Sequence, residues 1–593
     1  MKSKSGRFII IFNGEIYNHK DLREKINLKN KSKNTWRGHS DTEILVEAIE
    51  LFGLENTLKN VNGMFAFALW DNKNKELILV RDRFGEKPLY WGFANLDNHP
   101  NKEVFVFASE ISGIFSLKGF QKSINYNALS FYFKNGYINQ PQTIQEKINQ
   151  LRPGELLRIT PNKKGLFDQN NISKYFWWNS KKIFSESFNK KTLSDNNNDQ
   201  FYIDELEQIL QKVINQQSTS SDMPVGCFLS GGIDSSLITT LVQKESSKPI
   251  NSYTLKFDSS RGGSKDFDES IYANQISRHL GTDHTEVVLN AEDIIEIIPR
   301  IGKIYSEPFS DPSQVPSYLI CKNIKDNGIS VALSGDGGDE LFGGYNRHSL
   351  IPQINKYFGW MPLELKIAIS KSLLFLPVSR KGLIRDKIQK FSNSIIASGD
   401  PLEMYQSLKN LYLPMNEQHN SQNIISFEKE SLQSCNSLEE SLMFADTISY
   451  LPDDILVKLD RAAMANSLET RVPFLDNRVV EFAWDLPLKF KLRKKYGTSI
   501  SKWCLRQILY KYIPKKIIDR PKKGFSMPIG PWLRGPLRPW LMDMLSYEKI
   551  KKQGYLDPNF VERLISQHLS CREDNSLKLW NLLMWQAWLE NWY

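Results

Sequence analysis

The chain has 593 residues, of which 40% are hydrophobic and 24% are charged, and its formal net charge is +10 at pH 7. This length is too great for one hydrophobic core, so we expect two or three domains. No uncharged apolar run approaches the ~18 residues of a membrane helix, and the basic residues are spread along the chain, so we expect neither a membrane nor a nucleic acid as partner.

The five cysteines indicate neither a disulfide framework nor a zinc site, because they are widely separated and none belongs to a CxxC pair. They are Cys227, Cys321, Cys435, Cys504 and Cys571. The Lys/Ser-rich segment Met1–Gly6 is followed by neither an apolar targeting segment nor a small-residue cleavage site. We therefore expect a cytoplasmic protein whose thiols are reduced and mostly buried.

The beginning of the chain predicts β-structure. Arg7–Phe12 is a β-rich run that ends at Asn13-Gly14, which is a turn signal. Further on, Met64–Trp70 and Glu76–Arg81 flank a short polar segment, which is the pattern of a β-hairpin.

One helix interrupts these strands, because Ser40 or Asp41 can cap a helix over Thr42–Leu51 with apolar residues at helical spacing. Short strands and turns continue over residues 96–178. The polar stretch Lys181–Gln200 then has the Ser, Asn and Lys content of a linker.

From Phe201 onward, apolar strand-like runs alternate with helical patterns, which favours a parallel α/β sheet. The runs are Val225–Leu229, Ser252–Phe257 and Ile329–Leu333. Past about Tyr345 the pattern is mostly helical. Four tryptophans near the end have a spacing that fits one helical face, and we expect a buried packing stripe there. They are Trp580, Trp585, Trp588 and Trp592.

A candidate phosphate loop follows the first of these strands. The strand Val225–Leu229 leads directly into Ser230–Ser236, and a helical segment comes next. Its two glycines permit a tight turn, while its hydroxyls and the free N–H groups of the helix start can bind phosphate oxygens. Asp234 would repel phosphate unless a cation lies between them, so it implies Mg²⁺. The lysine of a GxxxxGK[ST] loop is absent.

An acidic loop follows the strand Ile329–Leu333, because Asp336, Asp339 and Glu340 lie within Ser334–Glu340. Parallel strands deliver their loops to the same edge of a sheet, where ligands bind. We therefore expect the phosphate-binding loop and the acidic loop to form one site.

A third element is the basic loop Arg520–Ser526, in which lysines lie beside a glycine. Such lysines can neutralise charge as a phosphate group departs. A solvated surface loop is the other interpretation of the same residues.

Several separated motifs resemble glutamine-dependent asparagine synthetases. In the second half these are LSGGIDSS at Leu229–Ser236, LSGDGGDELFGGY at Leu333–Tyr345 and SLETRVPFLD at Ser467–Asp476. In the first half they are FNGEIYNH at Phe12–His19, HSDTE at His39–Glu43 and RDRFGEKPLY at Arg81–Tyr90. The resemblance covers nearly the whole chain.

This resemblance implies α/β and α+β folds in two domains. Residues 1–178 are expected to form a glutaminase domain, an Ntn-hydrolase-like β-sandwich with helices that lacks its first strands. Residues 179–200 are expected to be a linker. Residues 201–593 are expected to form a doubly wound parallel α/β ATP-pyrophosphatase domain with a helical C-terminal region.

The implied activity is ATP-dependent adenylation of aspartate, followed by amidation with ammonia to give asparagine, AMP and pyrophosphate. ATP and Mg²⁺ are the implied cofactors, and aspartate, ATP and glutamine or ammonia are the small-molecule partners. By motif matching, the expected nucleotide-binding residues are Leu229, Ser230, Gly231, Gly232, Asp234, Ser235, Leu255, Ser334 and Gly335.

Motif matching also implies the metal and catalytic residues. Asp234 and Asp339 are expected to hold Mg²⁺. Asp336 matches an acid needed for the adenylate step or for deprotonating ammonia, where some relatives carry the longer Glu. Lys522 matches the lysine that stabilises charge during adenylation.

In the first half, Asn13 and Gly14 match an oxyanion hole, and Asp41 matches the residue that holds the amino group of glutamine. The nucleophile of the family is an N-terminal cysteine, yet this chain starts with Met1 and its first cysteine is Cys227. We therefore expect the chain as written to use free ammonia and not to hydrolyse glutamine. A wrongly placed start and a true ammonia-dependent paralogue both explain this difference.

Three alternatives stay open at this stage. The same adenylating site serves enzymes that act on other carboxylates, such as β-lactam synthetases and amidotransferases that modify sugars. A non-catalytic homologue is another alternative, since fold resemblance alone does not guarantee activity. A homodimer is also open, because the sequence does not show the oligomeric state.

Overall fold

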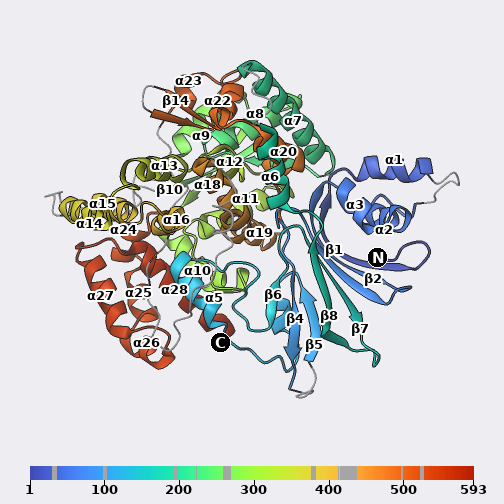
Figure 1. Ribbon diagram of the computed structural model, residues 1–593, viewed down its shortest axis with the longest axis horizontal. Helices are drawn as coiled ribbons and strands as arrows, with labels where there is room; N and C mark the ends of the chain where they lie inside the picture. The colour runs from blue at the N-terminus through green and yellow to red at the C-terminus, as the bar shows by residue number, and fades with distance from the viewer. Residues whose placement is uncertain are drawn as a thin grey trace.

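The computed structural model describes most of the chain. The described residues are 1–29, 36–97, 103–191, 198–221, 223–257, 269–374, 382–409, 411, 413, 437–495, 498–520 and 527–593. Figure 1 shows two parts, with the N-terminal β-structure on one side and a larger, mainly helical part on the other. Within the described residues, no helix has both the length and the apolar character needed to cross a membrane.

Two antiparallel sheets form the N-terminal part (Figure 1). The first has the order β1-β2-β3-β7-β8, with β1 Phe8–Ile16, β2 Gly63–Asp71, β3 Glu76–Arg81, β7 Glu155–Pro161 and β8 Phe167–Phe176. The second has the order β5-β4-β6, with β5 Glu103–Ala108, β4 Tyr90–Asn95 and β6 Ile148–Gln150.

The two sheets face each other across one apolar core, to which Leu79 of β3, Phe93 of β4 and Leu157 of β7 contribute. The outer face of the first sheet is covered by helices α1 His19–Lys29, α2 Asp41–Phe52 and α3 Leu54–Asn60. Helix α4 Ile111–Phe115 packs against the second sheet. This is the expected β-sandwich with helices.

The predicted turn at Asn13-Gly14 is wrong, because β1 continues through these residues to Ile16 and pairs with β2. Gly14 lies opposite Phe65, and a Cβ atom at Gly14 would lie 2.1 Å from the carbonyl oxygen of Met64. The glycine is therefore required for the close approach of two strands. Sheet pairing overrides the local turn signal.

Other local expectations of this region are confirmed. The hairpin joins β2 and β3 in antiparallel register. Helix α2 is capped by Ser40, whose side chain accepts a hydrogen bond from the backbone N–H of Thr42 at 3.2 Å.

A five-stranded parallel sheet forms the centre of the C-terminal part. Its order is β11-β10-β9-β12-β13, with β11 Asp283–Leu289, β10 Asn251–Phe257, β9 Val225–Phe228, β12 Val331–Leu333 and β13 Glu469–Arg471. The first strand of this sheet in chain order, β9, lies at the centre of the sheet. The next two strands, β10 and β11, lie on one side of β9, and the last two, β12 and β13, lie on its other side. This is a doubly wound sheet, and its topological switch point lies between β9 and β12.

Helices cover both faces of this sheet, because each face contributes to its own apolar core. One core contains Leu255 of β10 with α10 Ala291–Ile304, α11 Gln314–Asp326 and α28 Ser576–Trp592. The other contains Cys227 of β9 with α7 Asp199–Thr219, α8 Ile233–Glu245, α9 Ser270–Leu280, α20 Asn477–Asp485 and α22 Trp503–Leu509.

The remaining described elements of this part are mostly helical. They are α12 Gly338–Phe342, α13 Arg347–Phe358, α14 Leu363–Leu374, α15 Gly382–Ile396, α16 Pro401–Lys409, α18 Leu438–Ala445, the π-helix η4 Asp446–Ile455, α19 Leu456–Met464, the 3₁₀ turn η5 Pro473–Leu475, α21 Leu488–Lys491, α23 Lys515–Ile518, α24 Ile529–Arg534, α25 Arg538–Met544, α26 Tyr547–Gln553 and α27 Pro558–Leu569. A two-stranded ribbon joins β14 Leu492–Lys495 and β15 Thr498–Ser501.

The segment assigned to a linker differs from its prediction, since helix α6 Ser180–Lys191 occupies its first half and α7 starts at its end. Phe184 of α6 stacks on Phe444, with ring centroids 4.1 Å apart, and packs edge-on against Trp484. A few apolar residues at helical spacing therefore tie this polar segment to the C-terminal part. The domain boundaries themselves stay a prediction.

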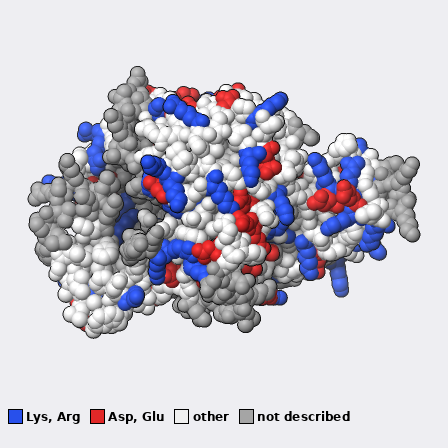
Figure 2. Space-filling model, turned by 90° about the horizontal axis from the view of Figure 1, so that it is seen from above, with Lys and Arg blue, Asp and Glu red and all other residues white. Residues whose placement is uncertain are grey.

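The tryptophan stripe packs as predicted at three of its four positions, while Trp592 is only partly buried. Trp580, Trp585 and Trp588 of α28 are fully buried, and the indole N–H of Trp588 donates to the carbonyl of Ser306 at 2.9 Å. Cys227, Cys321 and Cys504 are free and buried, as expected, while Cys571 is free and exposed. On the face in Figure 2, basic and acidic side chains are interspersed over the described surface.

Candidate active site

The phosphate-binding loop and the acidic loop lie side by side at the switch point of the parallel sheet. β9 and β12 are hydrogen-bonded neighbours, with Cys227 paired to Leu333, so the segments after them leave from the same edge. A crevice forms at such a point because the connections from the two strands run to opposite faces of the sheet.

Glycines allow the two loops to touch through their backbones. A Cβ atom at Gly335 would lie 2.6 Å from the backbone nitrogen of Ser235 and 2.9 Å from the carbonyl carbon of Asp234. A Cβ atom at Gly338 would lie 2.6 Å from Oδ1 of Asp234. A larger residue at Gly335 would force the two backbones apart, and one at Gly338 would displace the side chain of Asp234.

The loop after β9 is held in shape by its own hydroxyls. The Ser230 and Ser235 hydroxyl oxygens are 2.9 Å apart, and the Ser230 backbone N–H donates to Ser235 Oγ at 3.1 Å. Gly231 has φ +72°, a left-handed conformation that favours glycine. The loop then opens into α8, whose first turn presents backbone N–H groups.

Both loops line one cavity of about 760 Å³. Every residue of the C-terminal half that we predicted to bind nucleotide or metal lines it: Leu229, Ser230, Gly231, Gly232, Asp234, Ser235, Leu255, Ser334, Gly335 and Asp339. The predicted catalytic residue Asp336 lines it as well. Lys522 lies outside the described residues, so its assignment stays a prediction.

A buried lysine that the sequence analysis did not select joins the two loops. Lys502 Nζ forms ion pairs with Asp234 and with Asp339, the latter at 2.6 Å to Oδ1. Burial opposes the charge of Lys502, yet the two carboxylates outweigh it and raise its pKa well above the ordinary value. The two predicted metal ligands are therefore both within reach of one cation.

Asp336 is positioned by its own loop. The Ser334 hydroxyl donates to Asp336 Oδ2 at 2.5 Å, and the backbone N–H of Asp336 donates to Ser334 Oγ at 3.3 Å. Lys458 of α19 also lines the cavity, and its charge is stabilised by Asp311 and Asp336 although burial opposes it, so its pKa is raised. Asp336 thus has one oxygen committed to a neighbour and a buried ammonium nearby.

Two buried carboxyls beside these groups have shifted pKa values. Burial, followed by the charge of Asp311, raises the pKa of Asp454 to about 8. Burial, followed by the charge of Asp339, raises the pKa of Glu340 to about 8, although the Tyr345 hydroxyl donates to Glu340 Oε1 at 2.6 Å. Such shifted groups are concentrated at functional sites.

The predicted glutamine-binding residues lie together in the N-terminal part. Asn13 and Gly14 are adjacent in β1, and Asp41 Oδ2 accepts a hydrogen bond from the backbone N–H of Ile16 at 2.9 Å. The Asn13 amide donates to the hydroxyl of Ser109 at 3.3 Å. These three residues do not line the cavity described above, so the chain contains two separate groups of predicted site residues.

Ion pairs connect the two parts of the chain, and one of them is buried. Lys87 Nζ lies 2.9 Å from Asp460 Oδ1, and Arg461 lies 2.7 Å from Glu110. Arg461 also donates to the carbonyl of Ser109 at 3.4 Å. Helix α19 therefore carries Lys458 into the large cavity and, one turn later, residues that contact the N-terminal part.

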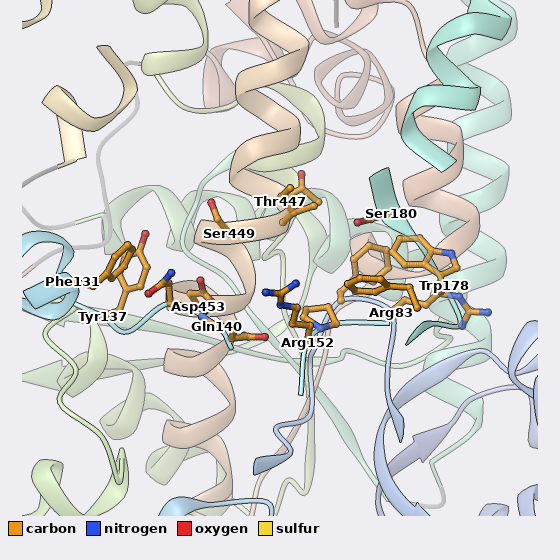
Figure 3. A pocket seen from close by; sticks show the side chains of 15 residues that line it. Arg83, Phe131, Tyr137, Gln140, Arg152, Trp178, Ser180, Thr447, Ser449 and Asp453 are labelled. Atoms are coloured by element: carbon orange, nitrogen blue, oxygen red, sulfur yellow. Dashed lines mark hydrogen bonds between the residues drawn. The ribbon is translucent and has the colours of Figure 1, made fainter. Parts of the chain in front are cut away.

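A second, smaller cavity of about 60 Å³ lies between the two parts. Figure 3 shows Thr447 and Ser449 of η4 on one side, with Gln140 and Arg152 from the N-terminal part opposite them. A π-helix is an uncommon element that is frequently found at functional sites. No residue of our predicted sites lines this cavity.

Comparison with protein families matches residues 205–590 to the family described as "Asparagine synthase" and residues 1–176 to the family described as "Glutamine amidotransferase domain". The first match alone covers more than half of the chain. The chain belongs to the asparagine synthetase family. Enzymes of this family are ATP-dependent amide ligases, and the chain is an enzyme of this type.

Curated relatives extend over almost the whole chain. "Asparagine synthetase (glutamine-hydrolyzing) 1" of Bacillus subtilis (strain 168) is 30% identical over 583 residues, which cover 98% of this chain and 85% of that relative. "Asparagine synthetase (glutamine-hydrolyzing) 3" of the same organism is 26% identical and covers 95% and 82%. "Amidase chry2" of Gibberella zeae is 24% identical and covers 93% and 82%.

The structure adds cavity residues of this family member that motif reasoning missed. They are Asp311, Arg347, Asp454, Lys458 and Lys502. None lies in a glycine-rich loop directly after a predicted strand, which was the signal that located the others. Each of these is a single charged residue in a helical or irregular segment, and in the sequence it looks the same as a charged residue on the solvent-exposed face of a helix. The sequence therefore carried no signal that identified these five residues.

Proposed function

We propose that this enzyme transfers AMP from ATP to the side-chain carboxylate of aspartate and then amidates the activated carboxylate with ammonia. The observation that carries this proposal is the convergence of the loops after β9 and β12 in one cavity. One loop supplies hydroxyl and N–H donors for phosphates, and the other supplies carboxylates.

ATP would lie with its phosphates on the loop after β9. The backbone turns tightly at Gly231, and Gly232 precedes the first turn of α8. Backbone N–H groups at a helix start bind phosphate oxygens, and the Ser230 and Ser235 hydroxyls add donors. Leu229, Leu255, Ser334 and Gly335 would then line the nucleoside side of the same cavity.

The residues fit Mg²⁺ as a cofactor. Asp234 and Asp339 offer hard carboxylate oxygens, and both already contact the single cation of Lys502, so both can reach one ion. In the described part of the chain, no group of three or more His, Cys, Asp or Glu side chains forms a metal cage. Mg²⁺ is usually held by one or two carboxylates together with substrate phosphates, and when bound it would neutralise phosphate charge.

The chemistry then has two balanced steps. A carboxylate oxygen of aspartate bonds to the α-phosphorus of ATP, and the bond from that phosphorus to the bridging oxygen breaks, which releases pyrophosphate. Ammonia nitrogen next bonds to the activated carbonyl carbon, the carbon–oxygen bond to AMP breaks, and one proton leaves the nitrogen. We propose that Asp336 takes that proton and that Lys522 balances charge in the first step.

In the N-terminal part we propose that Asn13 and Gly14 form an oxyanion hole for glutamine and that Asp41 holds its amino group. Their grouping in the second half of β1 and at the start of α2 supports this role. The match of residues 1–176 to an amidotransferase domain supports it as well.

The test is ATP–pyrophosphate exchange with the purified chain and MgCl₂, because exchange requires adenylation without the amidation step. We expect exchange with L-aspartate, and formation of AMP and asparagine in equal amounts once ammonium chloride is added. Ammonium serves as the nitrogen source, and glutamine is compared in a parallel reaction.

A panel of other acids is included because one relative is named an amidase. L-glutamate, succinate and β-alanine derivatives with a free carboxylate test for another acceptor. Exchange with one of these and none with aspartate would overturn the choice of substrate. Formation of ADP and orthophosphate in place of AMP would overturn the adenylation chemistry.

A further inference from the structure

The large cavity contains an arginine for which the proposed chemistry gives no role. Arg347 is the first residue of α13 and lines the cavity. Its Nε donates to Asp446 Oδ2 at 2.8 Å, which fixes one edge of the guanidinium. One terminal nitrogen, Nη2, is buried and has no hydrogen-bond partner among the described residues.

Aromatic rings hold this guanidinium in a fixed plane. Its Cζ atom lies 3.9 Å from the ring centroid of Tyr345 and 4.9 Å from that of Tyr450. The Tyr345 and Tyr450 rings are themselves edge-to-face, with centroids 5.8 Å apart. Arg347 is therefore oriented before any ligand arrives, which lowers the entropy lost on binding.

A buried donor without a partner is costly, and the cost is larger for a charged group than for a neutral one. The carboxylate of Asp446 does not remove this cost, because its two oxygens already bind Arg347 Nε, His348 and Tyr405. The planar fork of an arginine matches the two oxygens of a carboxylate. The unpartnered donor indicates that the guanidinium can still bind a ligand oxygen, and the side chain, which is 17% exposed, lines the cavity from which that ligand would approach.

The charges around Arg347 distinguish between possible anions. Lys409 and Lys458 line the same cavity, and so do the carboxyl groups of Asp311 and Asp454. A region with charges of both signs is unfavourable for a polyphosphate, because its carboxylates repel phosphate. It is complementary to an amino acid, which carries a carboxylate and an ammonium on one carbon. The phosphate-binding loop, in contrast, presents hydroxyl and N–H donors.

We propose that Arg347 binds the α-carboxylate of the acceptor amino acid and so selects an α-amino acid over a simple dicarboxylic acid. The proposal rests on the proposed function, since it assigns a specificity residue to that same cavity. Asp311 provides the negative charge that receives the ammonium group, and Asp454 adds a carboxyl oxygen that can accept a hydrogen bond from it. Arg347 acts in binding and has no part in bond making.

Kinetics of Arg347→Gln test this role. The variant keeps a polar side chain of similar reach and loses the charged fork. We expect the KM for L-aspartate in ATP–pyrophosphate exchange to rise about 10- to 100-fold, the range for loss of a charge-assisted hydrogen bond. The KM for ATP should change less than about threefold. Arg347→Lys keeps the charge without the fork, so its KM for L-aspartate should lie between those of the unmodified enzyme and Arg347→Gln.

Tyr405→Phe is the matched control, because Tyr405 bonds the same carboxylate of Asp446 but does not line the cavity. If Arg347 matters only by supporting the Asp446 cluster, Tyr405→Phe should raise the aspartate KM to the same extent, which would overturn the proposal. We expect its KM to stay within about twofold of the unmodified enzyme.

A substrate analogue gives a second readout that does not depend on folding of a variant. L-Aspartic acid 1-amide keeps the side-chain carboxylate and replaces the α-carboxylate by a neutral amide. The unmodified enzyme should use it about 100-fold less efficiently than L-aspartate, judged by kcat/KM. In Arg347→Gln this ratio should fall to about threefold or less.

The outcomes separate this proposal from the proposed function. No exchange with aspartate in the unmodified enzyme would remove the proposed function. Normal exchange with equal discrimination in the unmodified enzyme and Arg347→Gln would overturn only the role of Arg347. A rise in the KM for ATP with an unchanged KM for aspartate would show that Arg347 serves the nucleotide, which also overturns it.

Discussion

Lys502 Nζ lies 2.6 Å from Asp339 Oδ1 and also contacts Asp234, so one buried ammonium bridges the two loops of the cavity. The loops come from different strands, and their carboxylates would repel each other without this charge. Lys502 also occupies the position between the two predicted Mg²⁺ ligands. It is therefore both a structural link and a competitor for these carboxylates.

Lys502→Met should lower the free energy of unfolding in EDTA by about 3–5 kcal/mol, because it leaves buried carboxylates uncompensated. MgCl₂ should restore more stability to this variant than to the unmodified enzyme, since the ion replaces the lost charge. Urea denaturation followed by tryptophan fluorescence measures both effects.

Lys494→Met is the matched control, because Lys494 lies 3.9 Å from Glu439 and its side chain is 78% exposed. An exposed pair of this kind contributes less than about 1 kcal/mol. Equal losses in the two variants, or no extra response of Lys502→Met to Mg²⁺, would contradict the assignment.

Lys522→Ala should abolish ATP–pyrophosphate exchange, because the lysine is expected to stabilise charge as pyrophosphate departs. This prediction comes from the sequence motif alone, since Lys522 lies outside the described residues. Lys523→Ala, which replaces the neighbouring lysine of the same loop, should keep most of the activity. Exchange near the normal rate in Lys522→Ala would show that the motif match is wrong.

Gly335→Ala should separate the two loops, because the new Cβ atom would lie 2.6 Å from the Ser235 nitrogen and 2.9 Å from the Asp234 carbonyl carbon. Both are backbone atoms that cannot rotate away. We expect a loss of about 1–3 kcal/mol in stability and a fall of about 100-fold in the exchange rate, since small displacements in a catalytic site are costly.

Gly113→Ala serves as the control for this substitution. Gly113 lies in α4, and a Cβ atom there would meet Ala108 at 3.5 Å, which is ordinary contact. The change should be neutral or slightly stabilising because alanine favours helices. Similar kinetics in Gly335→Ala and Gly113→Ala would argue against tight contact of the loops.

Stability should fall as pH rises from 6 to 8, in part through Asp454. Burial and the charge of Asp311 raise its pKa to about 8, while the unfolded chain has an ordinary value near 3.8. The folded state therefore holds a proton that the unfolded state has already lost, so its stabilising contribution disappears as pH rises through the folded pKa. The expected loss is about 2 kcal/mol over this window.

Asp454→Asn should remove this part of the pH dependence. The pH dependence is measured as the change in the urea midpoint of unfolding between pH 6 and pH 8. Glu562→Gln, at an exposed position of α27, should keep the slope of the unmodified enzyme. If Asp454→Asn keeps the full slope, Asp454 is not the group that titrates.

The ion pair of Lys87 with Asp460 should couple the two parts of the chain strongly. Their side chains are 4% and 10% exposed, and Nζ lies 2.9 Å from Oδ1. Lys87→Met and Asp460→Asn should each cost about 3–5 kcal/mol, because each leaves one buried charge uncompensated. The double variant should cost at least about 2 kcal/mol less than the sum.

The control is the same set of two single variants and one double variant, a double-mutant cycle, made at Lys182 and Glu186. These residues lie one turn apart on α6, 3.9 Å apart and largely exposed. Their coupling energy should be about 0.3–0.5 kcal/mol. A coupling as small as this for Lys87 and Asp460 would show that the buried contact does not join the two parts.

Local patterns in the sequence located much of the fold and the two loops that meet in the cavity. The β2–β3 hairpin and the capped helix α2 are confirmed, because each depends on residues close together in the chain. The parallel sheet is confirmed as well, because apolar strands that alternate with helices are visible as a local pattern although the strands that pair are distant. The turn at Asn13-Gly14 failed because β1 pairs with a distant strand, and that pairing stabilises an extended backbone. Helix α6 was missed because its packing on Phe444 and Trp484 is not local.

The sequence by itself determined the family and the two loops that line the cavity, since glycines, serines and carboxylates directly after apolar strands have few other uses. Only the tertiary structure showed that Lys502 joins those loops and that Arg347, which lines the same cavity, has a donor without a partner among the described residues. A buried charge is identified by the partners that surround it. Those partners come from distant segments, so the role of such a residue is fixed only when the chain has folded.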